Sequence, residues 1–407
     1  MNPRRILVLI CLFGALHNLY GQAQSQPAGE WQKLSDDFWS WRARYAPFTG
    51  DDVNRIERPG GMRDWSRAKI DNQRKELAEF EARWKKIDPA SWAISRQVDY
   101  RLIGSALARV RWELDFNPRW KRDPTFYIEQ TLTPIVEALT VPGPYNAEQA
   151  REILTRIENI PAILQQATQN LANPPAPFAS VTVQALDNIR VHLHEMAAAL
   201  LRSTMEPAGA ERHGRESPRG DASREASVST LKPDELNAAC ERAADALEKF
   251  QAQLKEKLAS LPNESALGRD TYVWFLRNVA LMTFTPEELL AMANQEWNRA
   301  VAFEAYETDR NKDVAPLKMA DKIDNWIADA AQKELSIRKF LVERNILTVP
   351  DWLQHYTLRP FPEYLRAFEF TEADDFTSPS RLTENCIRYV PEPNDKLGYF
   401  LRATAMD

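Results

Sequence analysis

The chain has 407 residues, of which 44% are hydrophobic and 27% are charged, and its formal net charge is −6. This composition can bury a large core and argues against a disordered chain, a membrane bundle or a disulfide scaffold. The acidic balance provides no overall positive field to hold nucleic acid or an anionic membrane. Only 13 glycines accompany 12 tryptophans, which disfavours sheet-rich folds with many glycine turns, so an all-α fold is predicted.

Residues 1–23 are typical of a secretory signal peptide. Arg4 and Arg5 precede the apolar run Ile6–Leu16, and a small-x-small triplet ends at Ala23, after which we expect cleavage. The run is too short to span a bilayer as a helix, and no later run approaches the roughly 20 apolar residues that a span requires. We therefore expect a secreted or periplasmic protein without a membrane span.

The first part of the mature chain is rich in aromatic residues. Trp31, Phe38, Trp39 and Tyr45 recur near helical spacing. These side chains could form an aromatic binding cage, but their spacing favours plain packing in a core.

The sequence predicts a helix over residues 146–172. Asn146 and Gln149 form a capping-box arrangement at its start, and apolar residues follow at helical spacing. Pro161 should kink this helix, because a proline inside a helix removes a backbone hydrogen bond.

Two further long helices are predicted over residues 233–261 and 285–305. The first begins at Pro233 and carries an apolar residue every three or four positions; the second begins at Thr285 with a proline and two acidic residues in its first turn. Long antiparallel helices are the natural way to bury such stripes. Between the predicted helices, residues 206–230 have almost no large apolar side chain and are interpreted as a flexible insert. Residues 24–407 are otherwise predicted to form one helical domain.

The cysteines leave two questions open. Cys11 lies inside the apolar run and could carry a lipid, although no small residue precedes it. After export, Cys240 and Cys386 remain, and an oxidising compartment permits a disulfide between them. Cys240, however, falls on an apolar helical stripe, where a buried free thiol is the commoner outcome.

The candidate metal-binding residues fail on geometry. His192 and His194 are two positions apart, which is about 200° of helical rotation, so they cannot share one ion. His194 and Glu195 begin a zincin-like pattern, but position 198 is Ala instead of the required second His.

The remaining candidates are isolated. His213 lies in the predicted insert, and His355 is alone near Tyr356. The sequence has no glycine-rich phosphate loop, no Gly-x-Ser-x-Gly elbow and no paired-cysteine zinc spacing. We therefore assign no catalytic, cofactor-binding or metal-binding residue and expect no cofactor in this chain.

Several stretches of the sequence resemble a known family, and this resemblance gives information that the spacing of residues does not. The residues that carry it are Leu267–Asn278, Phe284–Leu290, Glu296–Trp297, Ala302–Glu304, Ser378–Leu382, Arg388–Pro391 and Tyr399–Asp407. These stretches resemble a bacterial family known only as domain of unknown function 885.

The resemblance implies a secreted helical protein related to zinc peptidases of the thimet-oligopeptidase and carboxypeptidase type, with a peptide substrate. In that family a His-Glu pair followed by Pro-Gly-His would form the zinc site, just beyond the counterpart of Asp407. This chain contains no such motif. We therefore expect a metallopeptidase-like helical fold truncated before its active-site segment, inactive by itself, with zinc only in a full-length relative. The alternative is a non-catalytic helical binding or scaffold protein of the cell envelope. The oligomeric state cannot be read from these residues.

Overall fold

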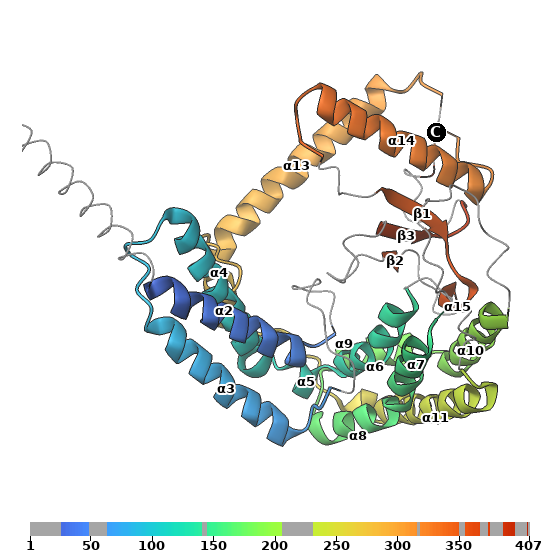
Figure 1. The fold of residues 1–407 in the computed structure, drawn as a ribbon, viewed down its shortest axis with the longest axis horizontal. Coiled ribbons are helices and arrows are strands. Elements are labelled where there is room, and N and C mark those ends of the chain that lie inside the picture. The colour runs from blue at the N-terminus through green and yellow to red at the C-terminus, as the bar shows by residue number, and fades with distance from the viewer. Residues whose placement is uncertain are drawn as a thin grey trace, which may run out of the picture. The chain divides into compact units, whose positions relative to one another are not determined.

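The computed structural model describes residues 26–48, 63–140, 145–205, 231–315, 318–349, 355–366, 373–374, 386–394 and 405. Its helices are α2 (Gln26–Tyr45), α3 (Arg67–Lys85), α4 (Ile94–Arg111), the π-helix η1 (Trp112–Phe116), α5 (Arg119–Arg122), α6 (Pro124–Leu139), α7 (Ala147–Glu158), α8 (Ile160–Asn170), α9 (Ala176–Ala185), α10 (Ile189–Met205), α11 (Pro233–Lys257), the 3₁₀ turn η2 (Leu258–Ser260), α12 (Arg269–Asn278), α13 (Pro286–Arg310), α14 (Ile323–Glu343) and α15 (Glu363–Arg366). The strands are β1 (Tyr356–Pro360), β2 (Ala373–Asp374) and β3 (Cys386–Val390). Helices dominate the fold (Figure 1), which confirms the predicted all-α class.

The chain divides into two compact units whose segments alternate along the sequence. The first unit contains Met1–Ala46, Ser66–Pro118 and Ala266–Leu290, and the second contains Pro47–Trp65, Arg119–Ser265 and Ala291–Asp407. The prediction of one domain over residues 24–407 stays a prediction, because two such units can also be parts of one domain. The predicted signal peptide, residues 1–23, and the predicted insert, residues 206–230, lie outside the described residues.

The first unit has an aromatic core. Phe38 and Trp41 of α2 are buried and contact the ring of Phe80 on α3, with ring centroids 5.8 and 5.3 Å away. Trp31 is also buried, beside Trp92 and Tyr100. Core packing is therefore confirmed for Trp31 and Phe38, whereas Trp39 and Tyr45 are half-buried.

A buried ion pair ties α2 to η1 within this unit. Arg42 is only 4% exposed, and its guanidinium donates two hydrogen bonds to the carboxylate of Glu113, at 2.7 and 2.6 Å. A buried arginine needs such a two-point partner, because an unpaired buried charge is costly.

In the second unit, α11 packs against α7, α8, α9 and α10. Its buried residues recur at helical spacing: Leu236, Ala239, Cys240, Ala243, Ala244, Leu247, Phe250 and Leu254. From Leu236 to Leu254 the predicted stripe is therefore the face that this helix buries, and the helix ends at Lys257, before the predicted end at residue 261. The helix predicted over residues 146–172 is also found, as α7 and α8 with a break at Asn159. Pro161 lies in the first turn of α8, which accounts for the predicted kink.

The capping box at the start of α7 is present. The Asn146 side chain accepts a hydrogen bond from the Gln149 backbone N–H at 2.9 Å, and the Gln149 side chain accepts one from the Asn146 N–H at 2.9 Å. Each bond satisfies a backbone donor that the helix cannot satisfy internally.

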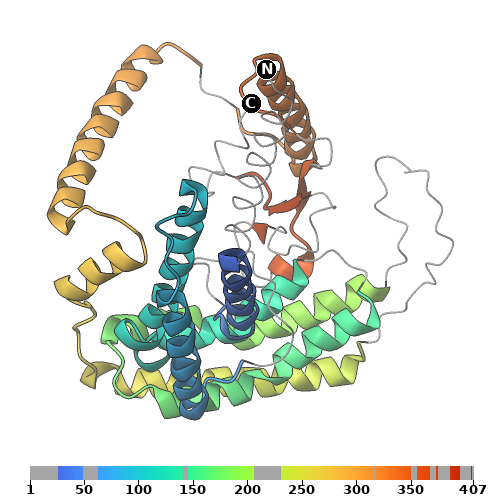
Figure 2. The ribbon, with the colours of Figure 1, turned by 60° about the vertical axis from the view of Figure 1, so that its left-hand side comes forward.

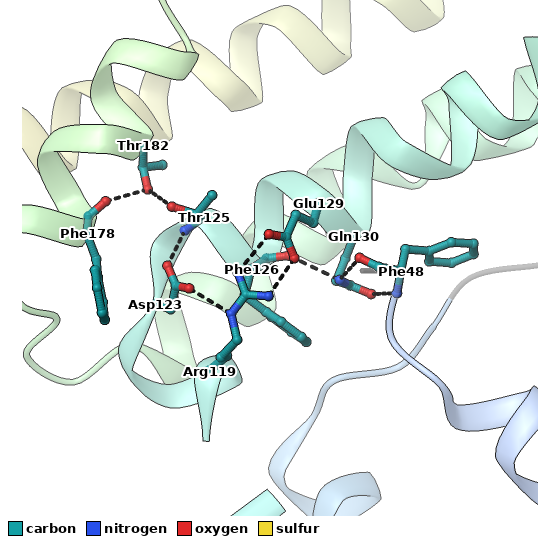
Figure 3. Close-up of polar contacts among 9 residues, drawn as sticks. All are labelled: Phe48, Arg119, Asp123, Thr125, Phe126, Glu129, Gln130, Phe178 and Thr182. Carbon is teal, nitrogen blue, oxygen red and sulfur yellow. Dashed lines mark hydrogen bonds and ion pairs between the residues drawn. The ribbon is translucent and has the colours of Figure 1, made fainter. Parts of the chain in front are cut away.

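Polar contacts lock α5, α6 and α9 together in the second unit (Figure 3). Arg119 donates to Asp123 at 2.8 Å and to both carboxylate oxygens of Glu129, and Thr125 shares a 2.9 Å hydrogen bond with Thr182 of α9. The side chain of Gln130 bonds both the N–H and the C=O of Phe48, at 2.8 and 3.0 Å. These polar side chains therefore stabilise the fold of the second unit.

The second unit also contains a small sheet that the sequence did not predict. Its strand order is β1-β3-β2, with β1 parallel to β3 and β2 antiparallel to β3. The pairing of β1 and β3 joins residues some 30 positions apart, from Tyr356 opposite Cys386 to Pro360 opposite Val390. Helix α14 packs beside β1, where Ile323, Trp326 and Val390 form part of a local core.

The helix predicted over residues 285–305 is present as α13, but its apolar stripe is not buried. Thr285 and Glu288 form a capping box at its start, as the Thr285 N–H donates to Glu288 at 2.7 Å and the Glu288 N–H donates to the Thr285 hydroxyl at 3.2 Å. None of its residues is buried, although it runs unbroken over 25 residues (Figure 2). The expectation that this stripe packs into a core is wrong for the part of the chain that the structure describes.

Candidate functional site

The first unit carries an open groove of about 560 Å³ between α4 and the end of α12. Its lining residues are Val98, Arg101, Leu102, Arg277, Leu281, Met282 and Thr283. Four of these side chains are aliphatic or thioether groups, and each of the four is exposed. Exposed apolar side chains that gather in one concave place are typical of a binding site.

One wall of the groove is a stripe on α4. Ile94, Val98 and Leu102 follow one another at intervals of four residues, so they lie along one side of the helix. They are 80%, 46% and 53% exposed, whereas Ile103 and Leu107 of the same helix are buried. Helix α4 therefore has a second apolar stripe beside the one that packs into the core.

The other wall is the chain segment that follows α12. The hydroxyl of Ser105 on α4 donates to the carbonyl of Val279 at 2.6 Å, and the Met282 N–H donates to the carbonyl of Leu276 at 2.7 Å. Leu276 and Val279 are buried, so they fix this segment against the core.

Leu281 adopts a left-handed backbone conformation, with φ of 53°. This region favours glycine, and a leucine there costs of order 1–2 kcal/mol. The side chains of Leu281 and Met282 are exposed at the groove. Backbone strain of this kind concentrates at functional sites, because the surrounding structure must hold it in place.

Two arginines, Arg101 and Arg277, line the groove. Within the described part of the chain, Arg101 and Arg277 form no hydrogen bond or ion pair. Several other arginines in this unit are paired with carboxylates, as Arg111 is with Glu81 at 2.7 Å. The groove therefore has an apolar wall and two positively charged side chains.

The histidines considered from the sequence are not brought together as a metal site. His194 of α10 contacts Glu241 of α11 at 3.0 Å, and Glu241 also pairs with Arg190. Among the described residues, no group of three His, Cys, Asp or Glu side chains lies close enough to hold a metal ion. The described residues therefore do not fit the zinc site that the family resemblance implies. His213 lies outside the described residues.

His355 is not alone, contrary to the sequence-based expectation. Its Nδ1 lies 3.0 Å from Oε2 of Glu334 on α14, and Glu334 also accepts a hydrogen bond from Arg338. Burial opposes ionisation of Glu334, but the hydrogen bonds from Arg338 and His355 outweigh it, so the pKa of this carboxyl lies below its usual 4.5. The pair supplies two metal-ligating groups, fewer than the three protein ligands of a catalytic zinc.

Cys240 is a buried free thiol, as its place on the apolar stripe of α11 predicts. Burial, together with the charge of Glu241, raises the pKa of this thiol to about 12. A thiol that stays protonated is a poor nucleophile and a poor metal ligand. Cys240 is therefore a core residue.

None of the described helices has the length and apolarity needed to cross a bilayer.

The fold and the groove define a helical protein with an open groove that carries two arginines. The chain belongs to the bacterial family of proteins of unknown function DUF885, whose model matches residues 47–390. A solved structure described as "a putative lipoprotein of unknown function from Shewanella oneidensis" is similar, with a TM-score of 0.55 and 17% identity, over 93% of this chain and 67% of that chain. At this identity the likeness shows the fold alone. No curated protein matches the chain.

Sequence reasoning missed the groove, although two signals were present. The repeat of Ile94, Val98 and Leu102 places a second apolar stripe on α4, and Arg277 lies in the stretch that carries the family resemblance. What the sequence could not show is that Arg101 and Arg277, 176 positions apart, line the same groove.

Proposed function

We propose that residues 24–407 form the N-terminal, helical portion of an extracytoplasmic metallopeptidase-like protein, exported through residues 1–23. In this proposal the chain contributes a wall of a peptide-binding cleft, and the zinc-binding residues come from sequence outside it. The proposal rests on the family membership and on the relationship to zinc peptidases that the resemblance of Leu267–Asn278 and the later stretches to this family implies. The extracytoplasmic location is supported by the sequence of residues 1–23 and by the description of the similar Shewanella protein as a lipoprotein.

The observation that carries this proposal is the exposed surface of α13. Leu290, Trp297 and Val301 fall on one side of this helix, and Phe303 and Tyr306 fall on the opposite side. Trp297 is 71% exposed, and Phe303 and Tyr306 are each 62% exposed. A helix that is apolar on two sides is typical of an element covered on two sides in a larger assembly.

The second half of α14 supports the same interpretation. Ile323 and Trp326 are buried at its start, but Ile337, Phe340 and Val342 near its end are more than half exposed. The similar Shewanella structure has about a third of its length outside the match, since the match covers 67% of that chain. We propose that sequence corresponding to this part covers α13 and the end of α14 in a full-length protein.

The purified mature chain should bind no stoichiometric zinc and hydrolyse no peptide. The mature histidines are His192, His194, His213 and His355, and none has a second histidine at chelating spacing. Elemental analysis after dialysis against a weak chelator, with a peptidase assay on the same sample, tests this expectation.

The variant His355→Ala, with His192→Ala as the matched control, gives the decisive comparison. One zinc per chain in the unaltered protein, lost together with peptidase activity in His355→Ala alone, would overturn both the absence of zinc and the truncated-peptidase proposal.

Reading the nucleotide sequence downstream of the codon for Asp407 is an independent test. A continuing frame that encodes His-Glu and Pro-Gly-His supports the proposal, and a stop codon with neither motif nearby counts against it.

A second function is favoured by the groove in the first unit. A non-catalytic binding protein of the cell envelope needs a concave surface that fits its ligand. It does not need a cluster of metal-ligating side chains. The groove at α4 and α12 supplies such a surface from residues of this chain alone. Ligand binding by the purified chain, without turnover, would support this function over the first.

A further inference from the structure

We infer that the groove between α4 and the end of α12 binds the anion of a long-chain carboxylic acid, with the hydrocarbon chain along the apolar wall and the carboxylate at Arg101 and Arg277. The inference deepens the second of the two proposed functions and does not depend on the metallopeptidase relationship.

The two arginines define the charge of the ligand. Arg101 and Arg277 line the groove, and none of the described residues that line it is acidic. A guanidinium carries a fixed positive charge in proteins, and its planar set of donors matches a carboxylate. An anionic end group is therefore the complement of this part of the groove.

The wall defines the body of the ligand. Val98, Leu102, Leu281 and Met282 offer hydrocarbon and thioether surface, and Thr283 supplies the one uncharged polar side chain among the lining residues. Val98 and Leu102 lie inside α4, whose backbone donors and acceptors are used within the helix. The α4 wall thus has few partners for the N–H and C=O groups of a peptide, and an unpaired peptide group that leaves water is costly.

A hydrocarbon chain has no such groups to satisfy, and it gains by removing apolar surface from water at both sides of the contact. The wall also continues past the groove, since Ile94 lies one turn before Val98 and Phe284 follows Thr283, and both side chains are exposed. A chain longer than the groove can therefore keep apolar contact beyond it. These features favour a long-chain carboxylate over a peptide.

The test is calorimetric titration of the purified mature chain with sodium tetradecanoate below its micelle concentration. The expected result is saturable one-to-one binding. Dodecyltrimethylammonium, which has a similar chain and the opposite charge, should not bind at this site, and hexanoate should bind far more weakly. Absence of tetradecanoate binding, or equal binding of the cationic amphiphile, would overturn the inference.

The double variant Arg101→Gln with Arg277→Gln should weaken tetradecanoate binding about tenfold or more, which corresponds to about 1.4 kcal/mol. Both side chains are exposed and unpaired within the described residues, so the variant should keep its fold, as circular dichroism can verify. Arg96→Gln is the matched control, since Arg96 lies on the same helix, with its guanidinium 5.7 Å from the ring centre of Trp92, and does not line the groove. Affinity that is unchanged in the double variant would place the ligand elsewhere, such as on the exposed faces of α13, and would refute the assignment.

A titration with a peptide distinguishes the two kinds of ligand. Acetyl-Leu-Leu-Leu with a free carboxylate carries the same end group on a peptide backbone. Tighter binding of this peptide than of tetradecanoate, with the same dependence on Arg101 and Arg277, would overturn the inference in favour of a peptide C-terminus. Zinc analysis of the same samples is independent of these outcomes, so failure of the ligand proposal and failure of the metallopeptidase proposal can be told apart.

Discussion

Replacing Leu247 with aspartate tests whether the stripe on α11 is the core of the second unit. Leu247 is fully buried, near the middle of a helix that packs against four others. The buried positions one turn to either side include Ala243, Ala244 and Phe250, none of which has a polar side-chain group. An aspartate at position 247 therefore finds no hydrogen-bond donor among these residues, and the side-chain amide of Gln251, one turn along, already donates two hydrogen bonds.

Leu247→Asp should lower the free energy of unfolding for two reasons. Loss of a buried leucine side chain removes about 1.5–3 kcal/mol of burial free energy. An unpaired carboxyl group in an apolar core adds several kcal/mol, even when the group becomes protonated. The sum is about 5 kcal/mol, comparable with the total unfolding free energy of an ordinary domain, about 5–15 kcal/mol. Leu247→Asp should therefore be largely unfolded or insoluble.

A milder variant keeps the test quantitative. Leu247→Ala should lower the unfolding free energy by about 3–5 kcal/mol, measured by urea denaturation followed by circular dichroism. Leu290→Asp is the matched control, because it makes the same chemical change in another 25-residue helix at a position that is 63% exposed. It should cost about 0.5 kcal/mol. Equal unfolding midpoints for Leu247→Asp and Leu290→Asp would refute the assignment of Leu247 to the core.

Three further predictions concern single residues. Gly104→Ala should lower the melting temperature, because a Cβ at Gly104 would lie 2.5 Å from Cζ2 of the rigid Trp84 ring, and such overpacking costs about 1–3 kcal/mol; a rise in melting temperature would show that the ring moves freely. Cys240 should resist alkylation by iodoacetamide at pH 8 in the folded protein and react after denaturation, because its thiol pKa is about 12; rapid labelling of folded protein at Cys240 would contradict its burial. Glu334 has a pKa lowered from 4.5, so its contribution to stability is present above pH 4.5 and is lost as the pH falls through its folded-state pKa. The difference in unfolding free energy between the unaltered protein and Glu334→Gln should therefore shrink on acidification, and a constant difference from pH 7 to pH 3 would exclude the stabilising hydrogen bonds at this carboxylate.

The sequence by itself determined the helices whose signals are local. The capping box of Asn146 and Gln149 is found where the sequence places it, because it involves residues three positions apart. The stripe of α11 and the break before Pro161 follow equally from near neighbours. The free thiol of Cys240 follows from its place on that stripe.

The candidate site and the sheet were decided by tertiary structure. The groove combines α4 with the end of α12, and the hydrogen bond from Ser105 to Val279 that holds its walls together joins residues 174 positions apart. The pairing of His355 with Glu334 and the pairing of β1 with β3 also join segments that no local pattern relates.

Helices α11 and α13 show the limit of the sequence most directly. Both are 25 residues long, both begin with a proline and acidic residues, and both carry apolar side chains at helical spacing. Leu247 is fully buried on the first, whereas Trp297 is 71% exposed on the second. The period of apolar residues determines which side of a helix gains by leaving water, but the neighbours that cover that side are set by contacts between distant parts of a chain or between chains.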